Sequence, residues 1–206
     1  MRASLADQGG CSVDSQLAIA LGANLPSAAG SPLETLVAVR EPLRQLLREW
    51  AGADRPLHRP VLLHWSPLFC TAPVGGPPDQ PDYLNAAVVV QGVGQPCTDR
   101  AQELLRALQQ LELAFGRQRH EHWGPRTLDL DLLWWGELDC ELPGLQLPHP
   151  RWHQRGFVLA PLLAIEQRWG SPLGVPQRFG PLSGLRPELP DPLPEPLTGA
   201  PLGWVV

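Results

Sequence analysis

Proline is concentrated at one end of this chain, and that distribution limits where regular secondary structure can form. The 206 residues include 25 prolines, and the stretch 171–206 contains 9 of them. Proline fixes its backbone φ angle and has no N–H to donate, so a stretch this rich in proline sustains neither a helix nor a central strand. We therefore predict an irregular C-terminal tail over 171–206, a flexible N-terminal extension over 1–16, and one folded domain over 17–170.

Between the two tails, apolar residues recur with the spacing of alternating strands and helices. Short apolar runs bounded by Gly, Pro or polar residues predict strands at 16–21, 61–69, 83–91 and 128–135. Helical spacing predicts one helix after the first strand, another after the third, and a shorter helical run near 156–166. The order βαββαβ predicts an α+β sandwich, in which helices pack on one face of a mainly antiparallel sheet.

The predicted helices have recognisable ends. In the first helix, Ser31 to Glu34 (SPLE) combines a capping serine, a proline in the first turn and the glutamate of a capping box. Pro42 lies inside the apolar stripe of the same helix and is expected to kink or split it near residue 41. In the second helix, Thr98 is predicted as the cap and Gly116 as the stop.

Net charge and arginine content restrict the classes of function. The formal net charge is −5 at pH 7, which argues against a surface built to coat nucleic acid or anionic lipid. All 16 basic residues are arginine, so the chain has neither the lysine of a phosphate-binding P-loop nor a Schiff-base lysine. Arginine side chains or backbone N–H groups must therefore bind any anionic substrate.

Cysteine spacing and apolar runs indicate the compartment. The four cysteines form no C-x-x-C pair and lack the spacing of a zinc site, so we expect them to be reduced. No stretch approaches the ~20 apolar residues that span a bilayer, and residues 1–16 lack the apolar segment of a secretion signal. We expect a cytoplasmic protein with no membrane partner.

The densest cluster of chemically useful residues is GRQRHEHWGPRTLDLDLLWW, at 116–135. Side chains alternate between the two faces of a strand, so Asp129 and Asp131 share one face while the leucines at 128, 130 and 132 enter the core. Two adjacent carboxylates repel each other, and a divalent cation such as Mg²⁺ relieves that repulsion. A solvated strand face without a metal is the alternative for so short a pattern.

Arginines beside the acidic pair favour the metal interpretation. Arg117, Arg119 and Arg126 precede the strand, in a polar segment that is predicted to be a mobile loop. Phosphoryl transfer requires metal-binding acids next to several arginines, because metal and guanidinium groups together neutralise the phosphates. Trp123, in the same loop, is either a hydrophobic lid or an anchor that packs the loop on the core.

Further candidates share strand faces or lie beside proline. Tyr83 and Asn85 are two residues apart on a predicted strand, where a ring can stack on a heterocycle and an amide can read its edge. Ordinary polarity of an edge strand is the alternative for this pair. Arg155 and Phe157 share a face only if the backbone between them is extended, and His149 either donates to a phosphate or stabilises its turn.

Taken in chain order, these residues resemble one family. The segments IALGANL, DQPDYLNAAV, LELAFGRQR, HWGPRTLDLDLL and LPHPRWHQRGFVLAPL, within 17–165, are similar to the 6-hydroxymethyl-7,8-dihydropterin pyrophosphokinases of folate biosynthesis. The resemblance implies a ferredoxin-like fold and transfer of the β,γ-pyrophosphoryl group of ATP to the hydroxymethyl group of a dihydropterin, with AMP as the other product. It implies a monomer whose partners are ATP and the pterin, without nucleic acid.

The same resemblance implies roles for individual residues. Carboxylates expected to hold two Mg²⁺ ions on the ATP phosphates are Asp129 and Asp131. Residues expected around the pterin are Thr71, Val74, Tyr83, Asn85 and Phe157. Residues expected at the nucleotide are Glu112, Arg117, Arg126, Leu132, His149 and Arg155. Residues expected to act in catalysis, partly from a loop that closes over the substrates, are Arg117, Arg119, Trp123 and Arg126.

Two departures from the family pattern and two alternative functions complete the sequence picture. Gly22-Ala23-Asn24 replaces a Gly-Ser-Asn turn, and His122 replaces a basic residue before the loop tryptophan.

A nucleotide-sugar glycosyltransferase also uses Asp-x-Asp, but it requires a larger α/β domain. An RNA-binding module of similar fold requires sheet aromatics and a basic surface, which the net charge of −5 disfavours.

Overall fold

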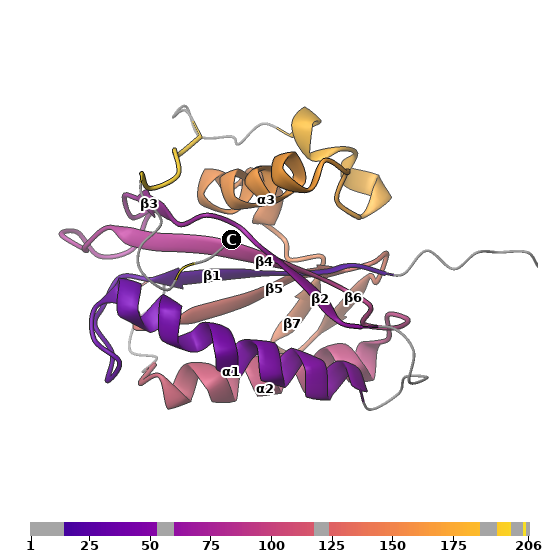
Figure 1. Cartoon of the computed structure of the whole chain (residues 1–206), viewed down its shortest axis with the longest axis horizontal. Helices are drawn as coiled ribbons and strands as arrows, with labels where there is room; N and C mark the ends of the chain where they lie inside the picture. Colours follow the sequence, from indigo (N-terminus) through magenta and orange to yellow (C-terminus); the bar gives the residue numbers. More distant parts are fainter. Residues whose placement is uncertain (1–14, 53–59, 118–123, 186–192, 199–203, 205–206) are drawn as a thin grey trace, which may run out of the picture.

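The computed structural model describes residues 15–52, 60–117, 124–185, 193–198 and 204 (Figure 1). The strands are β1 (Leu17–Ala23), β2 (Leu62–Trp65), β3 (Phe69–Thr71), β4 (Tyr83–Gln91), β5 (Asp129–Trp135), β6 (Cys140–Leu142) and β7 (Leu145–Leu147). The α-helices are α1 (Pro32–Gly52), α2 (Thr98–Ala114) and α3 (Gly156–Trp169). Single 3-10 turns are η1 (Trp152–Gln154), η2 (Gln177–Phe179) and η3 (Leu182–Gly184).

The main sheet is antiparallel, as the sequence predicted, but it has five strands in place of the predicted four. Its order is β2-β4-β1-β5. β3 pairs with β4 at residues 83–85, whereas β2 pairs with β4 at residues 88–91. The single strand predicted at 61–69 is wrong, because the segment 66–68 leaves the sheet and separates β2 from β3. Pro67 lies in this break, and proline cannot donate the ladder hydrogen bond that a continuous strand requires. The β6–β7 hairpin was not predicted.

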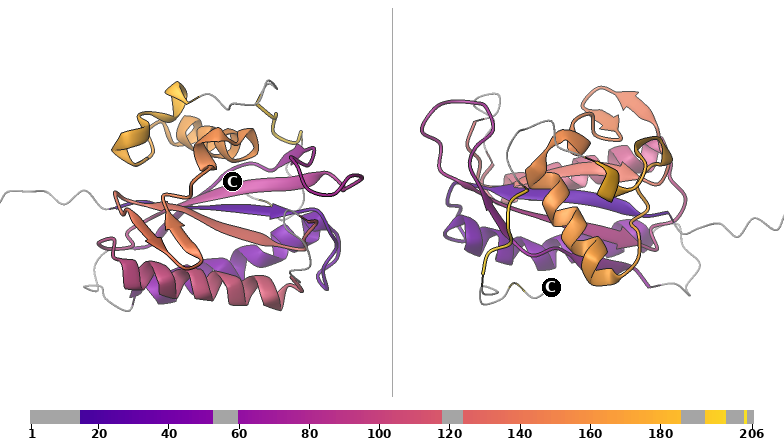
Figure 2. Two further views of the ribbon diagram at one scale, coloured as in Figure 1. Left: turned by 180° about the vertical axis from the view of Figure 1, so that it is seen from behind. Right: turned by 90° about the horizontal axis from the view of Figure 1, so that it is seen from above.

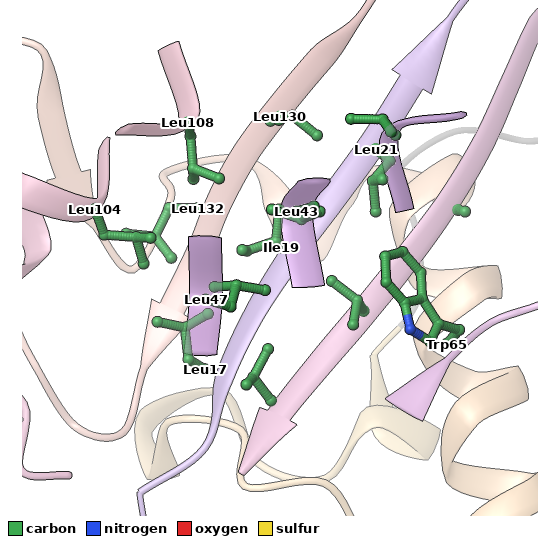
Figure 3. Close-up of a cluster of buried hydrophobic side chains, with 14 of the residues drawn as sticks. Leu17, Ile19, Leu21, Leu43, Leu47, Trp65, Leu104, Leu108, Leu130 and Leu132 are labelled. Atoms are coloured by element: carbon green, nitrogen blue, oxygen red, sulfur yellow. The ribbon is translucent and has the colours of Figure 1, made fainter. Parts of the chain in front are cut away.

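Helices cover both faces of this sheet (Figures 1 and 2). The two helices of the βαββαβ unit, α1 and α2, pack on one face, as predicted, and α3 covers the opposite face. Figure 3 shows the larger core, where leucines from α1 and α2 meet alternate residues of β1 and β5. The smaller core joins Ala18, Val89 and Trp134 to α3 residues such as Leu162.

The ends of the helices follow the sequence with two corrections. Ser31 N–H donates to the Glu34 carboxylate at 2.7 Å, and Glu34 N–H donates to Ser31 Oγ at 3.4 Å, which confirms the capping box. α1 continues through Pro42 without a break, since buried residues such as Val39 and Leu43 hold both of its halves on the sheet. Thr98 is the first residue of α2 rather than its cap.

The C-terminal tail is irregular in its described parts, as predicted, but those parts pack on the domain. The 170–185 segment contributes Leu173 and Leu182 to the core under α3. Trp204 is 1% exposed and belongs to the larger core. The proline-rich composition therefore prevents a helix here without preventing packing. None of the described helices has the length and apolar character needed to cross a membrane.

Candidate functional site

A cavity of about 420 Å³ opens between one end of the sheet and the start of α3. Its floor comes from β1, β4 and β5, one wall from the segment that follows β3, and the other wall from the 149–158 segment. The lining residues that the sequence singled out are Thr71, Val74, Tyr83, Asn85, Arg126, Asp129, Asp131, His149, Arg155 and Phe157. Ten of the predicted site residues therefore meet in one place, although the chain brings them from four different segments.

Three neighbouring strands form the floor of this cavity. Gly22 of β1 pairs in register with Asn85 of β4 on one side and with Asp129 of β5 on the other. A Cβ atom placed on Gly22 would lie 3.4 Å from Asn85 Oδ1 and 3.9 Å from the Cβ of Asp129. The missing side chain at residue 22 therefore keeps the floor open between an amide and a carboxylate.

One end of the cavity combines an amide with two aromatic rings. Asn85 is 5% exposed, and its Nδ2 donates to Thr71 Oγ1 at 2.8 Å, which fixes the orientation of the amide. Tyr83 O–H donates to the carbonyl of Gly124 at 3.2 Å. Phe157, in the first turn of α3, also lines the cavity. This end suits a flat heterocycle with donors and acceptors on its edge.

The other end holds Asp129 between two arginines. Arg126 donates from Nη1 to Asp129 Oδ2 at 2.8 Å, and Arg117 Nη1 lies 2.8 Å from Asp129 Oδ1. Arg117 also forms an ion pair with Glu112, which is 2% exposed. Glu112 accepts the N–H of Leu130 at 2.7 Å and so ties α2 to β5. Burial raises the pKa of Glu112, although its ion pair with Arg117 acts in the opposite direction.

The surroundings of Asp131 disfavour the charged form of its carboxyl group. Burial, followed by the nearby carboxylate of Asp129, raises the pKa of Asp131 from 3.8 to about 7. Arg155 and Arg126 lower this pKa only in part. No group of three or more His, Cys, Asp and Glu side chains suited to a metal ion lies in the described ranges. Two paired carboxylates fit Mg²⁺ that takes its remaining ligands from water and phosphate.

His149 is held next to β5, because its backbone N–H donates to the carbonyl of Leu133 at 2.7 Å. Burial, followed by repulsion from Arg155 and Arg151, lowers the pKa of His149 from 6.5 to about 4. His149 Nδ1 accepts the N–H of Arg151 at 3.4 Å, so the neutral ring carries its proton on Nε2. His149 is therefore a neutral donor at pH 7. Burial also lowers the pKa of the Arg155 guanidinium.

Several predicted residues lie apart from the cavity lining. Glu112 and Arg117 do not line the cavity themselves. Arg117 contacts Asp129, which lines it, and Glu112 contacts Arg117. The Leu132 side chain is 4% exposed in the core on the opposite face of the sheet and does not line the cavity, and its place at the nucleotide stays a prediction (Figure 3). Arg119 and Trp123 lie outside the described residues.

Sequence reasoning missed a positioning role for Asn24. Asn24 is 2% exposed, its Oδ1 accepts the N–H of Arg126 at 2.8 Å, and its Nδ2 donates to the carbonyl of Pro81 at 3.1 Å. Asn24 thus joins the turn that carries Arg126 to the segment that leads into Tyr83. Its signal in the sequence was an amide next to Gly22, in a turn that follows a buried strand.

Comparisons with known proteins agree with this geometry. A model of the 7,8-dihydro-6-hydroxymethylpterin-pyrophosphokinase family matches residues 18–167. The chain is 39% identical over 144 residues to a 2-amino-4-hydroxy-6-hydroxymethyldihydropteridine pyrophosphokinase of Pseudomonas aeruginosa, which covers 70% of this chain and 76% of the relative. A relative of the same name from Haemophilus influenzae is 36% identical over 147 residues, with 71% of this chain and 79% of the relative covered.

The match to a third relative is shorter. A protein of the same name from Synechocystis sp. is 46% identical over 97 residues, and the chain spans 47% of the length of that relative. All three relatives have the same name, and it describes the same kind of protein as the family model.

Proposed function

Because the chain belongs to the 7,8-dihydro-6-hydroxymethylpterin-pyrophosphokinase family, we propose that it transfers pyrophosphate from ATP to the hydroxymethyl group of 6-hydroxymethyl-7,8-dihydropterin. In this reaction, the hydroxymethyl oxygen bonds to the β-phosphorus of ATP as the bond between that phosphorus and the α-phosphate oxygen breaks. The products are AMP and the pterin diphosphate, an intermediate of folate biosynthesis.

The observation that carries this proposal is the division of one cavity into two chemically different ends. Asn85, Tyr83 and Phe157 surround one end, and Asp129 and Asp131 lie at the other with Arg126 and Arg155 nearby. A heterocycle with a hydroxymethyl arm fits across such a cavity, with its ring at the amide and its arm toward the carboxylates. The two substrates would then meet at the boundary that Gly22 keeps open.

At the pterin end, the chain supplies both stacking area and a fixed amide. The hydrogen bond from Asn85 to Thr71 holds the amide in one orientation, so its remaining donor and acceptor can read the edge of a ring. The rings of Tyr83 and Phe157 are only partly buried, and so they retain surface for stacking. A buried amide left unpaired by a wrong ring would penalise its binding.

At the phosphate end, the chain supplies cations and the carboxylates that would hold two Mg²⁺ ions. Asp129 and Asp131 would hold Mg²⁺, which would supply positive charge against the negative charge that develops on the phosphates during transfer. Arg126 and Arg117 would exchange the Asp129 carboxylate for phosphate oxygens, and the neutral His149 would donate from Nε2. Positioning and charge neutralisation then account for most of the acceleration.

A product assay tests the proposed reaction. The protein is incubated with Mg-ATP, with and without 6-hydroxymethyl-7,8-dihydropterin, and nucleotides are separated by chromatography. We expect AMP to form in stoichiometric amounts with the pterin diphosphate, and only when the pterin is present. ADP as the product, or AMP formed at the same rate without pterin, would contradict the proposal.

A further inference from the structure

The described C-terminal segment 193–198 lies against β3, at the edge of one cavity wall (Figure 1). Leu197 N–H donates to the carbonyl of Leu68 at 2.8 Å, and Pro196 forms an antiparallel bridge with Phe69. Two residues further along β3, Thr71 holds the amide of Asn85. The tail therefore occupies the open edge of the strand that orients this amide.

The same segment lies against the opposite wall. A Cβ atom on Gly156 would lie 3.7 Å from Pro194 Cδ and 3.8 Å from Leu193 Cδ2, so both side chains pack on the first residue of α3. Gly156 stands between Arg155 and Phe157, which both line the cavity. Residues 193–198 thus touch both elements that enclose the pterin end.

Trp204, further along the same tail, is anchored in the core of the domain. Its Nε1–H donates to the carbonyl of Ser66 at 2.9 Å, and its ring packs edge-on to Trp65 with 5.8 Å between centroids. The guanidinium carbon of Arg40 lies 4.6 Å from the centroid of each of these two rings. A buried indole with a satisfied N–H and a cation on its face is a strong attachment point.

The attachment point is also connected to β3 through the sheet. Ser66 is fully buried, its Oγ accepts the N–H of Ala87 at 2.9 Å, and its own N–H donates to the carbonyl of Ala87 at 2.9 Å. Ser66 begins the break between β2 and β3. Trp204 therefore contacts Ser66, which begins the short segment that leads into β3 and the cavity wall.

We propose that Trp204 and Leu197 are positioning residues for the pterin end of the cavity. Residues 193–198 together with Trp204, which we call the strap, hold β3 and the start of α3 at the separation that stacking on Phe157 and the hydrogen bond between Thr71 and Asn85 require. The identity of the ligand at this end rests on the proposed function, whereas the contacts of the strap do not. A strap that only adds stability would affect both substrates equally or neither.

Substitutions within the full-length protein separate these two roles. Trp204→Ala removes the attachment point. Leu197→Pro removes the N–H that bonds to Leu68, and its Leu197→Ala control keeps that N–H while trimming a side chain that is 38% exposed. Trp50→Ala is the matched control for Trp204, because Trp50 also donates from Nε1 to a carbonyl, packs edge-on to a tryptophan and carries an arginine over its ring, at the contact between α1 and α2.

Calorimetric titration with the pterin and with a non-hydrolysable ATP analogue gives the main readout. We expect Trp204→Ala and Leu197→Pro to weaken pterin binding about tenfold, since small displacements of binding groups carry large penalties, with little change in nucleotide affinity. Trp50→Ala should lower the Tm comparably and leave pterin affinity unchanged. Equal pterin affinity in all variants, or equal losses for both ligands, would overturn the proposal.

Hydrogen exchange without ligands keeps this test independent of the proposed function. Backbone amides at 69–71 and 156–158 should exchange faster in Trp204→Ala and Leu197→Pro than in the Trp50→Ala and Leu197→Ala controls. A wild-type protein that fails to bind the pterin would refute the proposed substrate and leave this exchange result to decide the role of the strap. Unchanged exchange at both walls would refute the strap itself. If Trp204→Ala does not fold, the milder Leu197→Pro and Leu197→Ala pair provides the same comparison.

Discussion

Arg126 and Asp129 form a 2.8 Å hydrogen-bonded ion pair in the free protein, although the proposed function assigns one to phosphate and the other to a metal ion. The pairing keeps a carboxylate and a guanidinium from standing uncompensated in a partly buried site. On the proposed function, binding of Mg-ATP would replace this ion pair with a contact from Arg126 to phosphate and one from Asp129 to the metal. The arginine would then hold the carboxylate in place until the metal binds.

Removal of either carboxylate tests this arrangement. We expect Asp129→Ala and Asp131→Ala each to lower kcat by at least about a thousandfold, because the lost metal ligand leaves phosphate charge uncompensated. Nucleotide affinity should also lose much of its dependence on Mg²⁺. Single-turnover measurements over a range of Mg²⁺ concentrations give both quantities. Full turnover with an unchanged Mg²⁺ dependence in either variant would refute the metal assignment.

The raised pKa of Asp131 predicts that Mg²⁺ binding depends on pH around neutrality. A metal ligand must lose its proton, so with a pKa of about 7 the affinity of the site for Mg²⁺ should rise as the pH increases toward 7 and level off above it. Calorimetry in buffers of different ionisation enthalpy should detect a proton released on binding near pH 6. A flat affinity between pH 5.5 and pH 8 would contradict this pKa.

The same pKa predicts the sign of a stability effect in the metal-free protein. The folded state retains a proton on Asp131 up to about pH 7, whereas an unfolded aspartate loses it near pH 4, so between these values the folded state binds more protons. Stability from this group therefore falls as the pH rises from 4 to 7. Asp131→Asn should raise the Tm at pH 8 and change it little at pH 4, as measured by thermal denaturation without Mg²⁺.

Residues at the pterin end should affect one substrate selectively. Asn85→Ala removes an amide that reads the ring edge, and Phe157→Ala removes stacking area, so both should weaken pterin binding far more than ATP binding. The expected loss is about 1–3 kcal/mol for each variant. Separate titrations with each ligand give the comparison. Equal losses for both ligands would mean that these side chains support the fold rather than the pocket.

Gly22 offers a test of the cavity floor. In Gly22→Ala, the added methyl lies at ordinary contact distances from Asn85 and Asp129, so the fold should tolerate it. The larger Gly22→Val should obstruct the boundary between the two ends and lower kcat/KM about a hundredfold, since the reacting groups are displaced. Circular dichroism checks that both variants fold. Unimpaired turnover in Gly22→Val would show that the substrates do not pass over residue 22.

Much of this structure could be predicted from local sequence patterns. Alternation of Asp129 and Asp131 with leucines identified a strand with one polar face, and Ser31 with Glu34 identified the start of α1. The break at Pro67 was missed, because the apolar run over 61–69 was read as one strand although its proline has no N–H for the ladder. The break expected at Pro42 was wrong, because burial of residues on both sides of it stabilises α1 by more than the loss of one backbone hydrogen bond costs.

The least predictable parts of the site depend on contacts between distant segments. Asn24 bonds to a residue 102 positions away, and Trp204 donates to a residue 138 positions away. Contacts between residues so far apart leave no periodic pattern in the local sequence. The proline-rich composition of the tail also concealed its packing, because composition describes which secondary structures are excluded and not which side chains are buried.

The two hydrogen bonds of the Asn24 side chain have a thermodynamic consequence. Since one amide holds both the Arg126 turn and the Pro81 carbonyl, neither segment moves without disturbing the other. On the proposed function, we therefore expect the free energy of filling the phosphate end to depend on whether the aromatic end is already occupied. By linkage, such a dependence is reciprocal, so each substrate would change the dissociation constant of the other by the same factor. A single buried asparagine would then make the two binding equilibria one coupled system.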